Sequence, residues 1–312
     1  MKTLLHTRWL LVPALLLGGC DGMKDAPDAD AAAVEAAAQA VFEADQQAWR
    51  DTRRERLLQP DGWASLIGLQ WIEPGAHRVG SDEDNGIRLA MGPAHLGVLR
   101  NDDGTLVFTP DADSGVRLDD APMGGAAPLR TDADPGGASV LSFDGGKGLA
   151  TAIARDDRLA LRVKHADAPS RTGFRGLTYW PGGPDWIVDA RYVPNPAGRT
   201  IDIVNIVGTV EPMPNPGRVE FERGGRTHRI EALDDGSGGV FLVFADRTSG
   251  HGSYGAGRFI DAPAPSNGRV RIDFNQAYNP PCAFTPFATC PLPPPENRLD
   301  LAVNAGEKAY VH

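Results

Sequence analysis

The side chains best suited to chemistry lie in the C-terminal third of the chain, at the ends of two expected strands. Asp246 follows a continuously apolar run, and Asp273 and Asn275 share the polar face of a segment in which apolar and polar residues alternate. If the two strands are neighbours, their ends bring both carboxylates, the Asn275 amide and Arg258 together. Such a group could bind a polar ligand, or act as acid and base if burial separated the two carboxylate pKa values.

A structural role is the alternative for the same residues, and the sequence leaves it open. Asp and Asn at strand ends commonly accept hydrogen bonds from turn backbone, and an Asp–Arg pair can serve stability alone. Tyr254, Tyr278 and Asn279 stand in the same third of the chain and complete the set of ligand-binding candidates. Tyr278 could either cover the edge of the core or form the wall of a pocket.

Metal and cofactor chemistry has little support in the sequence. The chain contains no GxSxG, Walker A, HExxH or paired CxxC motif. The histidines are never spaced as metal ligands, and the acidic cluster 82–84 is typical of a turn. We therefore expect no metal and no cofactor.

Cys282 and Cys290 stand in a proline-rich loop. Residues 280–295 contain seven prolines, which exclude a helix or a strand ladder there. In an exported protein such a pair is expected to form a disulfide, which would stabilise the fold by about 2–3 kcal/mol. A zinc site would need a second pair of ligands, and two free thiols are the other alternative.

The first 20 residues have the pattern of an export signal. A positively charged start precedes the apolar stretch 9–17, and two glycines precede Cys20. Residues 17–20 resemble the lipobox of bacterial lipoproteins, in which cleavage leaves a lipid-bearing cysteine at the new N-terminus. We expect Cys20 to hold the protein at a membrane, facing the periplasm, and Asp21 favours the inner membrane. An ordinary secretory signal is the alternative.

The charge of the chain excludes some partners. The 312 residues carry a net charge of −10, which becomes −12 once the signal with Lys2 and Arg8 is removed. Nucleic-acid binding needs a basic face that displaces counterions from phosphates, so no nucleic acid is expected. An acidic surface gains nothing from anionic lipid headgroups, so the membrane anchor would be the lipid on Cys20 and not the protein surface. The sequence identifies no protein partner.

Turn-forming residues favour an all-β fold. Glycine (37 residues) and proline (26 residues) together make up about a fifth of the chain, which leaves little room for long helices. Short apolar pieces between turn clusters predict two β-sandwich or barrel-like units behind one long helix. The expected parts are a signal peptide (1–19), a flexible acidic tether (20–33), the helix (34–60), an N-terminal β-sandwich (61–166) and a C-terminal β domain (167–312).

The start of the N-terminal unit resembles a known sandwich. Residues 78–80, 87–89 and His95 are similar to the first motifs of a forkhead-associated domain, which binds phosphothreonine. The arginine that would follow the glycine is Ser81 here, and no Ser-Arg pair precedes His95. Those side chains would contact the phosphate. The resemblance therefore implies the fold and not phosphopeptide binding.

A longer resemblance covers most of residues 60–310. Its most specific motifs are Asp273-Phe274-Asn275, Tyr278-Asn279-Pro280, Cys282, Cys290-Pro291 and Glu296-Asn297. These motifs resemble the bacterial and archaeal domain-of-unknown-function family 1684, DUF1684, which implies no established activity, substrate or cofactor.

We expect a membrane-anchored lipoprotein of the cell envelope that binds a polar small ligand in its C-terminal β domain. One alternative is a metal-independent hydrolase with Asp246 and Asp273 as acid and base. Another is an envelope scaffold protein without a small-molecule site. A concave pocket that contains Asp246, Arg258 and Asp273 would separate the first two from the third.

Overall fold

The computed structural model describes residues 29–312 except residue 235. The predicted signal peptide, Cys20, Asp21 and most of the predicted tether lie outside the described residues. The chain divides into two compact units, residues 1–42 and residues 43–312. Everything that follows on sheets, cores and sites concerns the second unit.

One long helix, α1 (Ala29–Leu57), occupies most of the range predicted for it and begins earlier, within the last residues of the predicted tether. Alanine, glutamate, glutamine and arginine are frequent in this segment, and all of them favour helices. Arg54 and Arg56 lie in the last turn, where cations interact favourably with the helix dipole. Pro60 follows and cannot continue the helix. No helix within residues 29–312 is both long and apolar enough to cross a membrane.

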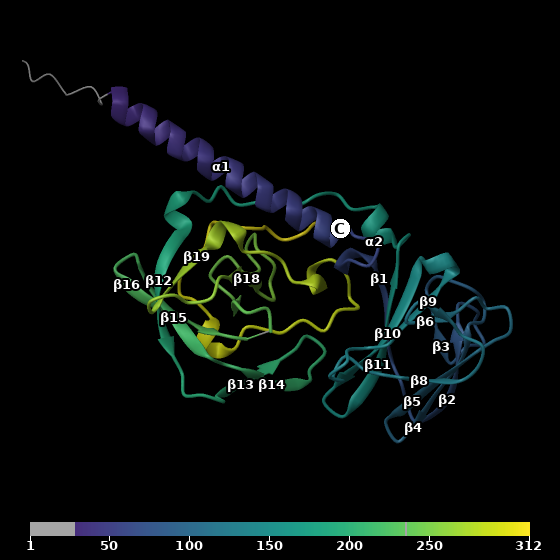
Figure 1. The fold of residues 1–312 in the computed structure, drawn as a ribbon. Coiled ribbons are helices and arrows are strands. Elements are labelled where there is room, and N and C mark those ends of the chain that lie inside the picture. The colour runs from purple at the N-terminus through teal and green to yellow at the C-terminus, as the bar shows by residue number, and fades with distance from the viewer. Residues whose placement is uncertain (1–28, 235) are drawn as a thin grey trace, which may run out of the picture. The chain divides into compact units, whose positions relative to one another are not determined.

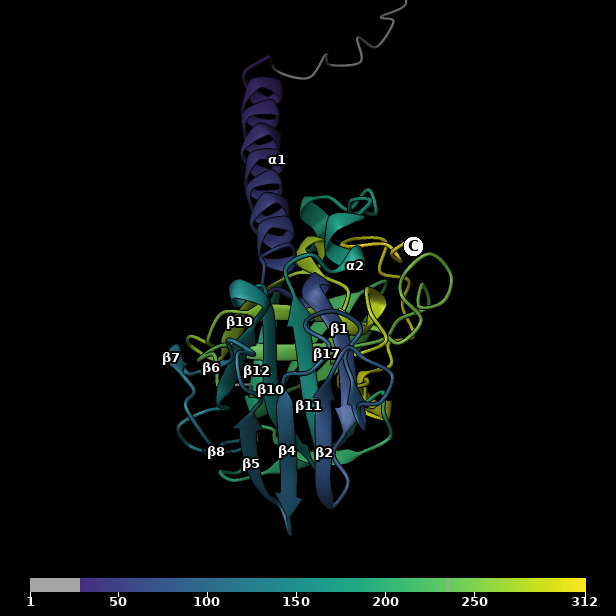
Figure 2. The same ribbon diagram turned by 90° about the vertical axis from the view of Figure 1, so that its right-hand side faces the viewer.

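Two sheets of short strands form the N-terminal β domain (Figure 2). One sheet has the strand order β1-β11-β10-β9-β6-β7 and the other β3-β2-β4-β5-β8. Their inner faces share one core, which includes Leu99, Phe108, Phe143 and Leu161. The strands are β1 (Leu66–Trp71), β2 (Gly75–Gly80), β3 (Ile87–Arg88), β4 (Gly97–Asp102), β5 (Thr105–Pro110), β6 (Arg117–Leu118), β7 (Ala121–Pro122), β8 (Ala127–Leu129), β9 (Val140–Phe143), β10 (Gly148–Arg155) and β11 (Arg158–His165).

The C-terminal β domain contains three further sheets (Figure 1). Four strands have the order β16-β15-β12-β19, and β13-β14 and β17-β18 form two-stranded sheets. The all-β fold with one long N-terminal helix is confirmed, whereas the likeness to a forkhead-associated domain stays a prediction. The strands are β12 (Ile187–Pro194), β13 (Thr200–Val204), β14 (Val210–Pro214), β15 (Gly217–Arg223), β16 (Arg226–Ala232), β17 (Val240–Phe244), β18 (Arg258–Ala262) and β19 (Arg269–Asp273).

Short helical turns connect these strands. The four-residue helix α2 links the two β domains, and single turns of 3-10 helix stand at several strand ends. Their bounds are α2 (Pro169–Thr172), η1 (Trp63–Ser65), η2 (Asp144–Gly146), η3 (Pro184–Trp186), η4 (Phe274–Gln276), η5 (Pro281–Ala283) and η6 (Pro295–Asn297).

Turn chemistry sets the register of two hairpins. Asp103 and Gly104 connect β4 to β5 with φ angles of 47° and 88°. Gly224 and Gly225 connect β15 to β16 with φ angles of 59° and 71°. Two-residue hairpin turns with positive φ at both positions match the twist of the strands, and glycine adopts such angles without strain. Gly224-Gly225 between two strand-like segments is a hairpin signal in the sequence, and the hairpin is present in the structure.

Strand β17 is buried at all five positions, as its continuous apolar run predicts. Leu242 and Phe244 contribute to a core shared with the four-stranded sheet. Phe241 and Val243 contribute to a second core, which also contains Phe259 and Cys290. Phe241, Phe259 and Cys290 of this second core also line the cavity described below.

Candidate functional site

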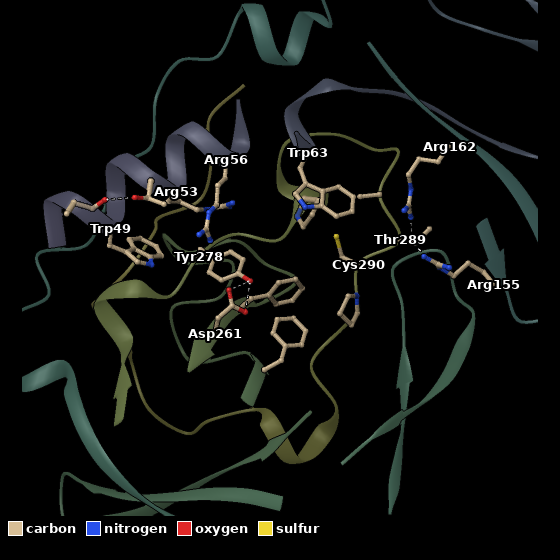
Figure 3. Close-up of a pocket in the computed structure, with 17 residues that line it drawn as sticks. Trp49, Arg53, Arg56, Trp63, Arg155, Arg162, Asp261, Tyr278, Thr289 and Cys290 are labelled. Carbon is tan, nitrogen blue, oxygen red and sulfur yellow. Dashed lines mark hydrogen bonds between the residues drawn. The ribbon is translucent and has the colours of Figure 1, made fainter. Parts of the chain in front are cut away.

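A cavity of about 650 Å³ opens where three segments of residues 43–312 meet (Figure 3). The last turns of α1 form one wall and strands β10 and β11 form another. The third wall comes from β18, the segment around Tyr278 and the proline-rich loop. Cavities of this size commonly bind one small organic molecule.

Two arginines on adjacent strands converge on one hydroxyl in the wall made by β10 and β11. Arg155 donates from Nε to Thr289 Oγ1 at 3.2 Å, and Arg162 donates from Nη2 to the same oxygen at 3.0 Å. Burial lowers the pKa of the half-buried Arg162, and the neighbouring charge of Arg155 lowers it further. Two positive charges are thus held close together at the cavity wall.

The two arginines differ in their acidic partners. Arg155 pairs with Asp132 at 2.8 Å and lies 3.5 Å from Glu211. No carboxylate lies within ion-pair distance of Arg162 among the described residues. Arg162 therefore has no ion-pair partner of its own within the described chain, although the charge of Asp132 acts on it at longer range.

Trp63 forms the rim beside Arg162. Its ring is 38% exposed, which is unusual for a side chain of this size. The Arg162 guanidinium carbon lies 5.6 Å and the Lys164 ammonium 5.3 Å from the ring centroid. Both cations are within reach of a cation–π interaction, which orients the indole at the cavity mouth.

The helical wall presents one face of α1. Trp49, Thr52, Arg53 and Arg56 line the cavity and have the spacing of one helix face. The Arg53 guanidinium lies 4.7 Å from the centroid of the Tyr278 ring and donates to the Asn279 carbonyl at 2.9 Å. Arg56 is exposed, and no carboxylate pairs with it in the described part of the chain.

Two buried carboxylates hold this helix in place. Glu307 is fully buried, and its Oε1 accepts from Arg53 at 3.0 Å. Asp273 Oδ2 accepts a hydrogen bond at 2.8 Å from the side chain of Gln46, which precedes Arg53 on the same helix. Burial raises the pKa of Glu307, and the nearby Arg53 guanidinium opposes this rise.

The electrostatic balance of the cavity is opposite to that of the whole chain. Among the described residues, four arginines and one carboxylate, that of Asp261, line it, in a protein with a net charge of −10. Arg53 and Arg155 are paired with carboxylates outside the lining, so the unpaired positive charges are those of Arg56 and Arg162. The Asp261 carboxylate accepts a hydrogen bond from the Tyr278 hydroxyl at 3.0 Å. Concave walls of one charge sign concentrate ligands of the other sign, so the cavity is suited to an anion. The arginines are Arg53, Arg56, Arg155 and Arg162.

Asp246 and Arg258, two predicted site residues, lie in contact but away from the cavity lining. Arg258 Nη2 donates to Asp246 Oδ2 at 2.8 Å, and both side chains are almost completely buried. Arg258 also donates to the backbone carbonyls of Val303, Ala305 and Glu307. Asp246 Oδ1 accepts from the Thr248 amide. These bonds tie the C-terminal segment to β17 and β18.

Asp273 and Asn275 form a separate group, and neither lines the cavity. Asp273 Oδ1 accepts from the backbone and side-chain nitrogens of Asn275 at 2.9 and 2.8 Å. Asn275 in turn exchanges hydrogen bonds with the amide and carbonyl of Gly183. The expected meeting of both carboxylates does not occur by strand pairing, because β17 pairs with β18 whereas β19 pairs with β12.

The three remaining candidates have different surroundings. Tyr278 lines the cavity, as one of its two predicted roles requires. The Tyr254 hydroxyl donates to the Cys282 carbonyl at 3.1 Å, and burial raises its pKa. The backbone N–H of Asn279 donates to the Glu307 carboxylate, and the side-chain NH₂ of Asn279 donates to the Lys308 carbonyl. Tyr254 and Asn279 thus connect backbone segments beneath the cavity wall.

The predicted disulfide is not formed in the structure. Cys282 and Cys290 are free thiols that lie against each other, and the Cys282 amide donates to Cys290 Sγ at 3.1 Å. Their contact raises the pKa of Cys290, whereas the hydrogen bond from Cys290 lowers that of Cys282. The loop keeps its shape without the cross-link because Tyr254 and the backbone of β13 hold it.

Sequence reasoning missed most of the cavity. The spacing of Trp49, Arg53 and Arg56 is the one sequence signal that could have marked these residues as a single helix face. Arg155 and Arg162 carry no local signal, because their meeting with Thr289 joins residues 134 and 127 positions apart.

One group outside the cavity has metal-ligand atoms close together. Donor atoms of Asp82, Asp84 and His95 all lie within 4.8 Å of one another in an exposed turn. His95 Nδ1 lies 3.7 Å from Asp84 and Nε2 lies 4.0 Å from Asp82, so its two nitrogens face different carboxylates. Exposed acidic groups commonly lie this close together without an ion, so the cavity and not this turn is the candidate site.

Comparisons with known proteins identify relatives of unknown function. The model of a family described as "Protein of unknown function (DUF1684)" matches residues 172–308. An uncharacterized protein of Haloarcula marismortui, solved by solution NMR, is 30% identical over 44% of this chain and 78% of that chain, with a TM-score of 0.37. No curated protein matches the chain.

Proposed function

The chain belongs to the DUF1684 family, and we propose that this member is a lipid-anchored cell-envelope protein that binds a small anionic ligand in its arginine-lined cavity. The observation that carries the proposal is the reversal of charge between the acidic chain and the cationic cavity. Anions would be repelled by most of the surface and attracted to this one hollow.

Binding fits this cavity better than the hydrolase alternative does. The oxygens of Asp246 accept from Arg258 and backbone amides, and those of Asp273 accept from Gln46 and Asn275. A general acid or base must reach a reacting group, whereas both carboxylates are buried in hydrogen bonds away from the cavity lining. The scaffold alternative gives no reason for a cavity of about 650 Å³ with four arginines.

A fluorescent anion tests the proposal. Anilinonaphthalene sulfonate should bind the wild-type protein saturably with one-to-one stoichiometry. Thr52 is exposed and lines the cavity, so Thr52→Trp should fill the space and weaken binding by about tenfold or more. Gln47→Trp adds the same ring to an exposed helix position outside the lining and should leave binding unchanged. Equal binding by all three proteins would refute the cavity as the site.

Attachment to the membrane is tested separately, through Cys20. A lipid on this cysteine would keep the protein in the membrane fraction, because several acyl chains hold far more tightly than one. Cys20→Ser should move the protein to the soluble fraction, and Asp21→Ser should change its distribution between the inner and outer membranes. Membrane association that survives Cys20→Ser would refute the lipid anchor.

A further inference from the structure

We infer that the ligand combines one oxyanion group, held by Arg155, Arg162 and Thr289, with one flat ring system that packs against the aromatic wall of the cavity. This inference rests on the proposed function and names the class of ligand. It follows from the unequal distribution of charge and rings around the cavity (Figure 3).

Thr289 supplies the first argument for an oxyanion. A threonine hydroxyl has two acceptor lone pairs and one donor hydrogen. Arg155 and Arg162 each donate to Thr289 Oγ1, so both lone pairs are used. No acceptor takes its hydrogen among the described residues, and Thr289 lines the cavity. The hydroxyl is therefore a donor available to a ligand oxygen.

Arg162 supplies the second argument. It has five N–H donors, of which one is used by Thr289, and it has no carboxylate partner in the described part of the chain. Its charge is disfavoured by burial and by Arg155. An oxyanion between the two guanidinium groups would give Arg162 the anionic partner that it lacks and accept charge-assisted hydrogen bonds from both arginines.

Aromatic rings line much of the remaining wall. Phe241 and Phe259 meet edge to face with centroids 5.0 Å apart, and Phe259 meets Tyr278 in the same way at 5.8 Å. Trp49 and Trp63 contribute two more rings from the helix and the rim. Such rings are rigid and flat, so they complement a planar group better than a flexible chain.

The size of the cavity requires more than an isolated anion. A volume of about 650 Å³ lies in the range that encloses a drug-sized molecule, and a free phosphate or carboxylate would fill a small part of it. Arg155, Arg162 and Thr289 lie together at one end in Figure 3, and Trp49 and Tyr278 lie toward the other. A ligand that spans this length carries its charge at one end.

Calorimetric titration with matched compounds tests the inference on the full folded protein. Naphthyl phosphate and naphthoate carry a ring and an oxyanion, naphthol lacks the oxyanion, and butyl phosphate and inorganic phosphate lack the ring. We expect naphthyl phosphate or naphthoate to bind at least about tenfold more tightly than any of the other three. The tighter of the two identifies the oxyanion as phosphate or carboxylate.

Two arginine variants on one strand locate the oxyanion. Arg162→Gln should weaken binding of the preferred naphthyl compound by about tenfold and leave naphthol unchanged, because only the oxyanion contacts this side chain. Arg158→Gln is the matched control, since Arg158 lies on β11 outside the lining, over the ring of Trp71. It should change neither affinity.

Failure of this inference can be told apart from failure of the proposed function. If anilinonaphthalene sulfonate binding depends on the cavity but naphthol binds as tightly as the naphthyl anions, the oxyanion subsite is refuted and the binding function stands. Butyl phosphate binding as tightly as naphthyl phosphate would refute the flat ring. An Arg162→Gln protein with wild-type affinities would refute the assigned position of the oxyanion.

Discussion

Arg258 and Arg162 are two buried or half-buried arginines with opposite surroundings. Arg258 meets a carboxylate at 2.8 Å and three backbone carbonyls, whereas Arg162 meets one threonine hydroxyl and a second arginine. Both leave Nε without a partner in the described part of the chain, so an unpaired nitrogen alone does not distinguish them. The difference lies in charge neutralisation, and it separates an arginine that stabilises the fold from one that can bind a ligand.

Removing the charge of Arg258 should have the largest effect. Arg258→Met leaves Asp246 buried without its partner, which typically costs about 3–5 kcal/mol of unfolding free energy. Urea denaturation measures this loss. Arg226→Met is the control, because Arg226 forms an exposed pair with Asp300, and its loss should cost less than about 1 kcal/mol. Similar losses in both variants would contradict the structural role of Arg258.

The Arg53–Glu307 ion pair is intermediate between Arg258 and Arg162, because it is buried but also lines the cavity through Arg53. Its contribution to the unfolding free energy should depend on pH. Burial raises the folded-state pKa of Glu307 above its ordinary value of 4.5. The protonated Glu307 carboxyl therefore favours the folded state. This contribution to the unfolding free energy is fully present at a pH below the pKa of Glu307 in the unfolded chain, and it is lost as pH rises through the pKa of Glu307 in the folded protein. The difference in unfolding free energy between wild type and Glu307→Gln should therefore shift in favour of the variant as pH rises above 4.5. A difference that is constant with pH would contradict the raised pKa.

Neutralising Arg162 should change stability less than neutralising Arg258. Burial and Arg155 both disfavour its charge, so Arg162→Gln relieves a penalty while it removes one hydrogen bond. We expect the unfolding free energy to stay within about 1 kcal/mol of wild type. A loss as large as that of Arg258→Met would assign Arg162 to the structural class and break the comparison.

Substitution of Arg56 should change ligand affinity least, because this side chain is exposed and solvent screens its attraction for an anionic ligand. Arg56→Gln should weaken binding of anilinonaphthalene sulfonate by about twofold to fivefold at low salt, with the difference vanishing at high salt. Arg54→Gln is the matched control on the same helix, outside the cavity lining. If both variants weaken binding equally, the effect comes from the net charge of the helix and not from the position of Arg56 in the cavity lining.

The sequence predicted local features well because local residues determine them. The helix, the hairpin at Gly224-Gly225 and the buried strand 240–244 follow from composition, turn chemistry and hydrophobic pattern. The contact between Asp246 and Arg258 was also anticipated, although as part of a ligand site.

The cavity was beyond the sequence because it is made by contacts between distant segments. Thr289 meets Arg155 across 134 positions, and no periodicity or motif predicts such a meeting. The sequence could not show that Asp273 lies outside the cavity lining for the same reason, since sheet order and not sequence order decides which strand ends are neighbours. The short separation of Cys282 and Cys290 in the sequence correctly indicated that the two side chains lie close together, but it did not determine whether they form a disulfide.

A crystal structure of the protein with naphthyl phosphate is the most direct test of the central claim. The phosphate should lie between Arg155 and Arg162 within hydrogen-bond distance of the Thr289 hydroxyl, with the rings against Tyr278. A ligand bound elsewhere on the protein, or a phosphate turned away from both arginines at saturating concentration, would contradict it.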